Sequence, residues 1–518
     1  MTAALLSTDV QRFRALVGRH LGLRFEDSRL TQLADVLRSR LADTSLDVDA
    51  YLGRLAASGP SRREVRALAR ELTVGETYFF RNGEQFRAFS EVALPERMRV
   101  RADRRRLQIL SAGCASGEEA YSLAILLSER LADPSWSVSI GAVDLNAAAL
   151  ARAAQGSYSP WSLRETPADT QRRYFRPRGP ELVLDEGVRR LVRFEERNLA
   201  EADGDLWLPG TYDVVFCRNV LMYFTPENAA ALVGRIATSL APGGYLFLGH
   251  AETLRGLSHD FHLRHTHGTF YYQRRESVAT GAASPAGQGA TVPAHEASVV
   301  PAVDGGDAWV DVIRRASDRI HALAHAARGA SESSRGGGDA RPRSAPGASR
   351  PAWDLGLAME LLKEERFGEA LDRVDRLPAE AAADGDVLLL RAALLTHNGR
   401  LAEAERTCEA LLRVDELSAG AHYLLALCRE GVGDLVGATH RDQIAAYLDP
   451  SFAMPRLHMG LMARRAGDRS TACQELSRAL ELLQNEDASR LLLFGGGFSR
   501  DALRALCRAE IVACGGRP

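Results

Sequence analysis

The stretch ILSAGCASGEEAYSLAI (109–125) decides the fold of the middle of the chain. Its apolar start predicts a buried strand, and its second half predicts a helix over 118–132. Between them, Gly113 and Gly117 permit a sharp turn and a close approach of the backbone to a ligand. Glu118 and Glu119 fall in the first helical turn, where they would repel a phosphate and suit a cationic group such as an ammonium or sulfonium.

The same strand–helix alternation continues on the C-terminal side of this stretch. Strands are predicted in SVSIGAVDLN (137–146), TYDVVFCRNVL (211–221) and GGYLFLGH (243–250), with helices over 146–154 and 226–240. Strands that alternate with helices form βαβ units around a parallel sheet. On the N-terminal side the apolar spacing is helical instead, and four helices are predicted, in 7–23, 27–44, around Tyr51–Leu55 and in Val65–Leu72.

A repeat of 34 residues marks the C-terminal part. Ala or Gly recurs at this spacing in two series, namely Ala358, Ala392, Ala426 and Gly460, and then Ala370, Ala404, Ala438 and Ala472. Small residues at two fixed places let the two helices of a unit pack closely, and such units stack as a solenoid. The pattern resembles tetratricopeptide repeats and predicts four units over 351–486, followed by a capping helix in 487–518.

Composition gives the remaining boundaries. Residues 277–307 and 328–350 are rich in Gly, Ala, Ser and Pro, which predicts a flexible linker over 276–350 with a short helix near 308–327. The expected organisation is a helical subdomain over 1–77, an α/β domain over 78–275, the linker, the repeats and the cap. The fold class is therefore α/β with an all-α solenoid appended.

Charge and cysteine usage exclude several classes of function. Lys and Arg number 65 against 67 Asp and Glu, a net charge of −2, which argues against a bulk polyanion binder. The arginine-rich run over 97–107 is interpreted as a solvated helix face. No membrane span and no secretory leader are apparent, so a cytoplasmic protein is expected. Seven cysteines without a C-x-x-C pair, and loosely spaced histidines over 250–267, specify no metal site.

Six segments together carry a family resemblance, from about residue 8 to 275. They are ELTVGETYFFR (71–81), ILSAGCASGEEAYSLAI (109–125), VDLN (143–146), RNL (197–199), YDVVFCRNVLMYF (212–224) and LAPGGYLFLGHAE (240–252). In order and spacing they resemble the CheR-type chemotaxis-receptor methyltransferases. The resemblance implies a Rossmann-like domain that uses S-adenosylmethionine, with S-adenosylhomocysteine as product, to esterify receptor glutamates.

The resemblance also implies a cofactor site, position by position. The matching residues are Thr77, Arg81, Glu118, Asp144, Asn198, Leu199, Cys217 and Arg218. Asp144 would hold the ribose hydroxyls, Glu118 the methionine ammonium group, and Asn198 with Leu199 the adenine. One departure is Gly75, where the family often has Asn, and the loss of one side-chain hydrogen bond costs about 0.5–1.5 kcal/mol.

The chemistry implied by the resemblance needs no general base. A glutamate carboxylate, with a pKa of about 4.3, is already ionised at neutral pH. Catalysis should therefore come from positioning and desolvation of the reacting groups. Arg81 and Tyr223 are the residues expected to hold the substrate carboxylate, although a helix-capping arginine and a core tyrosine are the structural alternatives.

Partners follow from the same reading. Arg29, Arg38 and Arg40 could form a basic face that docks an acidic receptor bundle, or could be scattered surface arginines. The repeats are expected to recruit a protein or peptide. The main alternative is an adaptor whose methyltransferase domain only senses the cofactor, and Gly75 is the feature that favours this alternative. A nucleic-acid methyltransferase is disfavoured, because the relevant loop reads Arg218-Asn219-Val220 and lacks a base-stacking Pro-Pro motif.

Overall fold

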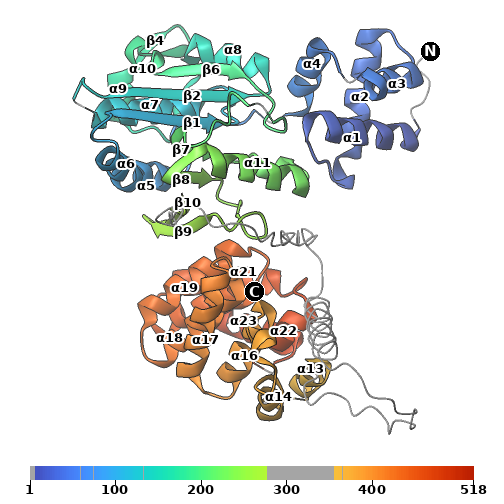
Figure 1. The fold of residues 1–518 in the computed structure, drawn as a ribbon, viewed down its shortest axis with the longest axis vertical. Coiled ribbons are helices and arrows are strands. Elements are labelled where there is room, and N and C mark those ends of the chain that lie inside the picture. Colours follow the sequence, from blue (N-terminus) through green and yellow to red (C-terminus); the bar gives the residue numbers. More distant parts are fainter. Residues whose placement is uncertain are drawn as a thin grey trace, which may run out of the picture. The chain divides into compact units, whose positions relative to one another are not determined.

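The computed structural model describes residues 6–276 and 355–517, except 59, 74, 132, 203, 365 and 497. The chain separates into two compact units whose boundary falls near residue 302. Figure 1 shows an α/β part with N-terminal helices in one unit and an all-α part in the other. The fold class expected from the sequence is confirmed. The helix expected near 308–327 lies outside the described residues.

The chain begins with four helices, as the sequence predicts. They are α1 (Ser7–Leu21), α2 (Leu30–Thr44), α3 (Val48–Ser58) and α4 (Arg62–Leu72). Their apolar faces meet in one core that includes Phe13, Leu33 and Leu37, none of which is exposed. α1 ends at Gly22, where φ is +75° and an added Cβ would lie 2.5 Å from the Cβ of Ala200. Only glycine fits this junction with the α/β part.

Of the two alternatives for Arg29, Arg38 and Arg40, a basic face or scattered arginines, the structure favours scattered arginines. Arg40 is only 6% exposed, and its guanidinium donates to both carboxylate oxygens of Glu64 and to Asp43. Arg38 is exposed but bonds Asp35, one turn earlier on the same helix. Arg29 is half-buried, with its guanidinium over the ring of Phe25. The spacing on α2 could not reveal that Arg40 faces inward, because its partner Glu64 comes from α4.

A seven-stranded sheet forms the centre of the first unit, in the order β6-β2-β1-β7-β8-β10-β9. Five strands are parallel, namely β1 (Arg106–Ala112), β2 (Ser137–Asp144), β6 (Val192–Glu196), β7 (Tyr212–Cys217) and β8 (Leu240–Leu248). The hairpin of β9 (Phe261–Thr266) and β10 (Thr269–Arg274) adds an antiparallel edge. The strand order reverses between β1 and β7, which is where open α/β sheets bind ligands.

Helices flank this sheet along its length. They are α5 (Gly83–Ala88), α6 (Leu94–Val100), α7 (Glu118–Arg130), α8 (Ala147–Gln155) and α11 (Pro226–Ser239). A small antiparallel sheet of β3 (Ser157–Tyr158), β5 (Glu181–Leu184) and β4 (Phe175–Arg178), with the short helices α9 (Ala168–Tyr174) and α10 (Glu186–Arg189), lies between β2 and β6 in the chain.

The arginine-rich run does not form a uniformly solvated face. Arg97, at its start, is 2% exposed, and its guanidinium donates to the buried carboxylate of Asp213 on β7. Arg101 donates to the same carboxylate oxygen at 2.7 Å. The run therefore fixes α6 to the sheet, while Arg104 and Arg105 are exposed.

The second unit consists of antiparallel helix pairs. The pairs are α13 (Leu355–Lys363) with α14 (Phe367–Val374), α16 (Gly385–His397) with α17 (Leu401–Val414), α18 (Ala419–Gly431) with α19 (Leu435–Leu448), and α20 (Ala453–Arg465) with α21 (Arg469–Leu482). α16, α18 and α20 begin at 385, 419 and 453, so the 34-residue period of the sequence is the period of the helices. A short helix, α15 (Ala379–Ala382), follows the first pair.

The tail differs from the expectation of a single capping helix. It holds two helices, α22 (Ala488–Phe494) and α23 (Arg500–Ala513). Gly496 lies between them and has a φ of +63°. Consecutive glycines disfavour a continuous helix, which explains the break.

None of the helices in 6–276 or 355–517 is long and apolar enough to cross a membrane. Within the same residues, no group of three or more His, Cys, Asp or Glu side chains is arranged to hold a metal ion.

Candidate functional site

A cleft opens at the carboxyl ends of β1, β2 and β7, where the strand order reverses. Its volume is about 820 Å³ with its open mouth included. Its lining combines the strand ends with the N-terminal helices, and it includes Leu21, Arg24, Arg29, Gly75, Gly113, Ala115, Asp144, Asn146, Asn198, Leu199, Asn219, Val220 and Tyr223. The lining is mostly apolar with a few polar groups, as in small-molecule sites.

The glycine turn after β1 forms the floor of the cleft. Gly113 has a φ of +81°, and an added Cβ would lie 2.4 Å from Cγ2 of Val220. Gly117, at the start of α7, has a φ of +90°, and its Cβ would lie 2.8 Å from the Cβ of Ala153. Both positions therefore require glycine for backbone conformation and for space. Val220 and Ala153 crowd the turn that the sequence predicts, so side chains larger than that of glycine do not fit at these two positions.

Asp144 ends β2 on one wall of the cleft. Its Oδ2 accepts from the backbone N–H of Ala115, and its Oδ1 accepts from that of Asn146, both at 2.8 Å. Burial raises the pKa of this carboxyl, and the backbone N–H groups oppose that rise. Two donors leave further acceptor capacity on the two oxygens, so the carboxylate can also accept from a ligand hydroxyl.

The N-terminal helices form a second wall, which the sequence reasoning missed. The backbone N–H of Arg24 donates to the carbonyl of Tyr223 at 2.7 Å, and Leu23 forms a β-bridge with Phe224. The side-chain amide of Asn198 donates to the carbonyl of His20, at the end of α1. These bonds join residues about 200 positions apart, for which no local sequence signal exists.

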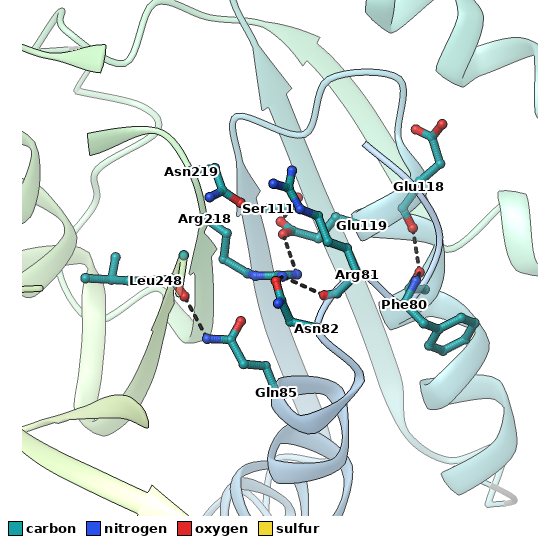
Figure 2. Close-up of polar contacts among 12 residues, drawn as sticks. Phe80, Arg81, Asn82, Gln85, Ser111, Glu118, Glu119, Arg218, Asn219 and Leu248 are labelled. Carbon is teal, nitrogen blue, oxygen red and sulfur yellow. Dashed lines mark hydrogen bonds and ion pairs between the residues drawn. The ribbon is translucent and has the colours of Figure 1, made fainter. Parts of the chain in front are cut away.

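A buried arginine organises the neighbouring part of the site (Figure 2). The guanidinium of Arg218 pairs with Glu119 at 3.3 Å and donates to the carbonyl of Arg81 and to Oδ1 of Asn82. Glu119 in turn accepts from the hydroxyl of Ser111 at 2.7 Å. Burial lowers the pKa of Arg218, and the Glu119 carboxylate raises it. The network fixes the main chain at Arg81, and Figure 2 shows the Arg81 guanidinium extending toward Asn219.

The residues implied by the family resemblance therefore fall into three groups. Asp144, Asn198, Leu199 and Tyr223 line the cleft, and Arg81 and Arg218 belong to the adjoining network. Thr77, Glu118 and Cys217 do not line it. Glu118 is buried, accepts from the hydroxyl of Ser116, and points away from the Arg218–Glu119 pair in Figure 2. Burial raises the pKa of its carboxyl.

Glu252 is a further polar residue of the site that the residue-level reasoning passed over. Its Oε2 accepts from the backbone N–H groups of Gly249 and Asn219, and its Oε1 from those of Val220 and Met222. The residue is only 4% exposed. One carboxylate thus fixes the loop that leads from β7 to Tyr223. Glu252 is the last residue of the segment LAPGGYLFLGHAE, and the family resemblance of this segment was the signal that could have identified it.

Gly75 also lines the cleft, beside the strand-end residues. An added Cβ would meet only the guanidinium of Arg152, at 4.0 Å. Space is therefore available for a Cβ at this position, where the family often has asparagine, and packing around the Cβ does not require glycine.

Known proteins resemble this chain over the same region. Residues 75–270 match the family model described as CheR methyltransferase, SAM binding domain. The chemotaxis protein methyltransferase of Vibrio parahaemolyticus is 33% identical over 269 residues, 51% of this chain and 96% of the relative. Chemotaxis protein methyltransferase 2 of Vibrio cholerae is 34% identical over 283 residues, 52% of this chain and 94% of the relative.

One relative extends over the helical repeats as well. The probable biofilm formation methyltransferase WspC of Pseudomonas aeruginosa is 28% identical over 470 residues, 90% of this chain and 97% of the relative. The doubly wound sheet, its glycine turn and the family match define an S-adenosylmethionine-dependent methyltransferase. More particularly, the chain belongs to the CheR family of chemotaxis protein methyltransferases, with 34-residue helical repeats appended.

Proposed function

We propose that the chain transfers a methyl group from S-adenosylmethionine to glutamate carboxylates of a chemoreceptor-like signalling protein, forming methyl esters. The main support is that two features lie together at the loop after β7, namely the cleft and the hydrogen-bond network of Arg218. The cleft contains Asp144 and Asn198, and the Arg218 network brings Arg81 beside it. The relatives that cover this region are named chemotaxis protein methyltransferases.

The residues of the cleft fit the cofactor. Asp144 retains acceptor capacity for ribose hydroxyls, and the space that Gly113 leaves lets the main chain approach a bound molecule. Leu199 supplies an apolar surface for a flat ring. Asn198 already donates to His20 and Glu201, so its role is to hold the wall rather than to donate to adenine. S-adenosylmethionine, when bound, supplies an electrophilic methyl group on its sulfonium sulfur.

The remaining catalytic work is positioning. The acceptor carboxylate is ionised at neutral pH, so no base is required. Arg81 would orient this carboxylate by charge-assisted hydrogen bonds, and Tyr223 would help to hold it. Arg218 and Glu119 act indirectly, because their bonds fix the backbone at Arg81. The bond from Arg24 to the Tyr223 carbonyl places the second residue in the same way.

The docking surface for an acidic partner is proposed on α4 and α3 rather than on α2. A second, open cleft of about 1450 Å³, with its open mouth included, is lined by Arg54, Arg63, Arg66 and Arg70, together with residues of α2 and α8. Three of these arginines lie on one face of α4, at spacings of three and four residues. The two cleft linings include successive residues, Asn146 and Ala147, at the start of α8. An acidic helical surface would be steered to this face.

The test combines a binding and a transfer measurement. The protein is titrated with S-adenosylmethionine in a calorimeter and then incubated with radiolabelled cofactor and receptor-enriched membranes. We expect binding, and label that is released as methanol by mild alkali, since esters are base-labile. Arg81→Ala should reduce transfer far more than cofactor affinity. Cofactor binding without any transfer would favour the adaptor alternative.

The docking surface is tested separately. Arg63→Glu with Arg70→Glu should lower kcat/KM for the protein substrate about tenfold at low salt, because rim charges act on association. Arg104→Glu, an exposed arginine outside this cleft, is the matched control. Equal rates for both variants would remove α4 from the docking surface.

A further inference from the structure

The two tail helices have different positions on the repeats. α23 packs on α21 and buries Leu503, Cys507 and Ile511, so it covers the exposed side of the last pair. α22 instead contacts α13 and α16, the first helices of the first two pairs. Capping is therefore achieved by α23. α22 lies against the face formed by the first helices, which in stacked repeats is the concave face.

The ring of Phe494 is the anchor of α22 on this face. It lies 5.9 Å from the ring of Tyr423 on α18 and 5.1 Å from that of Phe452, just before α20, between ring centroids. A Cβ added at Gly420 would lie 2.8 Å from the Phe494 ring and 3.2 Å from Leu389 on α16. The face thus holds an aromatic side chain between three helix pairs, and Gly420 makes the room.

Side chains of the same face bind the main chain of α22. Nε2 of His397 lies 2.9 Å from the carbonyl of Leu493, and the Tyr423 hydroxyl donates to the carbonyl of Phe494 at 3.5 Å. Burial lowers the pKa of His397, which favours the neutral ring as the donor. The last carbonyls of a helix lack partners within it. These two side chains supply them, and they would do so for any helix ending at this place.

An ion pair completes the contact one turn earlier. Arg490 lies four residues before Phe494, and its guanidinium pairs with Asp449 at 2.8 Å and with Glu486 at 3.2 Å. The same guanidinium stacks over the ring of Phe452 at 4.6 Å. Asp449 belongs to the repeats, so the face offers a carboxylate for a basic residue and a pocket for an aromatic residue one helical turn further on.

We propose that this first-helix face is a peptide-docking site, that α22 covers it in the free protein, and that its partner is a helical peptide with a basic residue followed four positions later by an aromatic one. The partner displaces α22 because both require the Phe494 pocket and Asp449. Its apparent affinity is then reduced by the fraction of molecules in which the face is uncovered. The inference does not depend on the methyl acceptor proposed above.

The experiment uses the full chain and a fluorescent peptide with the sequence of residues 484–496. Phe494→Ala and Arg490→Glu each weaken α22 at a different contact. Phe498→Ala is the matched control, because Phe498 is 61% exposed and follows α22. In fluorescence anisotropy we expect the two α22 variants to bind the peptide at least about tenfold more tightly than the wild type and the control.

The specificity arm uses a peptide in which Phe494 is replaced by Ala, and we expect its binding to be lost. Retained binding would overturn the aromatic requirement. A Phe494→Ala protein with an unchanged circular dichroism spectrum that binds no more tightly than the wild type would overturn the proposal. If that protein does not fold, Arg490→Glu decides by the same comparison, and equal affinity to the wild type would likewise overturn it.

Discussion

Asp144 shows how single residues of the site balance opposing effects. Its burial disfavours the charged carboxylate, yet two backbone N–H groups donate to that charge. The position could be predicted, because an acid at the end of the second strand of such a sheet has a known place. The four bonds to Glu252 could not, because they depend on a loop conformation that no local pattern specifies.

Gly75 gives a prediction of gained function. Gly75→Asn should tighten S-adenosylmethionine binding about two- to tenfold, because a hydrogen bond contributes roughly 0.5–1.5 kcal/mol and an added Cβ has space. Calorimetric titration of the wild type and variant measures the change. Gly53→Asn on α3, where nothing lies within 4 Å of an added Cβ, controls for general effects of the substitution. Unchanged or weaker affinity at position 75 would show that the missing amide is not a cofactor contact.

The arginines of α2 and α6 mark the limit of residue-level prediction. Helical spacing identified which residues share a helix, but not which arginine meets a carboxylate from elsewhere. Arg40 pairs with Glu64, which is 24 residues away in the sequence, and Arg97 pairs with Asp213, which is 116 residues away. A buried arginine needs such a partner. The sequence predicted that Arg40 and Arg97 would be exposed, and these pairings explain why they are buried.

At the scale of elements, the loop after β7 is a rigid part of the site because Glu252 holds it. Glu252→Gln keeps the size of the side chain but removes the charge and replaces one acceptor oxygen by a donor. We expect kcat for methyl transfer to fall about tenfold or more with a smaller change in cofactor affinity, since charge-assisted bonds contribute roughly 1.5–3 kcal/mol. Glu84→Gln, an exposed position on α5, is the control. A variant with wild-type kcat would contradict a positioning role.

The repeats contain a buried ionic cluster that makes their stability depend on pH. Nδ1 of His458 on α20 lies 2.7 Å from Asp442, and its Nε2 lies 2.8 Å from Glu430, which also pairs with Arg465. Burial opposes protonation, but the hydrogen bonds to both carboxylates outweigh it and raise the pKa of His458. Burial, partly offset by His458, raises the pKa of Asp442 to about 7.

The raised pKa values of His458 and Asp442 determine the direction in which stability changes with pH. A group whose pKa is raised in the folded state contributes stability at low pH, and this is lost as the pH rises through the folded value. The Tm of the helical repeats should therefore fall as the pH rises through about 7, the folded pKa of Asp442. Thermal melts followed by circular dichroism measure this, and His458→Gln should flatten the dependence. A Tm that rises instead would contradict the assigned charge states.

The elements themselves were largely predictable. The 34-residue period predicted the spacing of α16, α18 and α20, and the quoted strand segments contain β2 and β7 and most of β1 and β8. The 34-residue period predicts only the repeated helices, so it does not predict α22. Nothing in the apolar pattern of 487–518 distinguishes a helix that caps the last pair from one that turns back onto the first helices.

At the scale of the whole molecule, the two units are expected to act separately in cofactor binding. Every residue of the cofactor cleft lies between 21 and 224. We therefore predict that residues 1–275 fold alone and bind S-adenosylmethionine with unchanged affinity. An insoluble fragment, or one with weaker cofactor binding, would contradict the independence of the two units.

Recruitment is the second prediction for this fragment. A tethered binding domain raises the effective concentration of its partner near the active site. The rate of receptor methylation at substrate well below saturation should therefore fall for residues 1–275 relative to the full chain. Identical rates would show that the repeats serve a partner unrelated to the methyl acceptor.

The most direct test of the central claim is mass spectrometry of a chemoreceptor-like protein after incubation with the full chain and S-adenosylmethionine. Methyl esters on glutamate side chains are the predicted product, and mild alkali should remove them. Asp144→Ala should abolish them at limiting cofactor, because it removes two charge-assisted bonds of roughly 1.5–3 kcal/mol each. Methylation confined to other residue types, or cofactor binding without modified glutamates, would contradict the assignment.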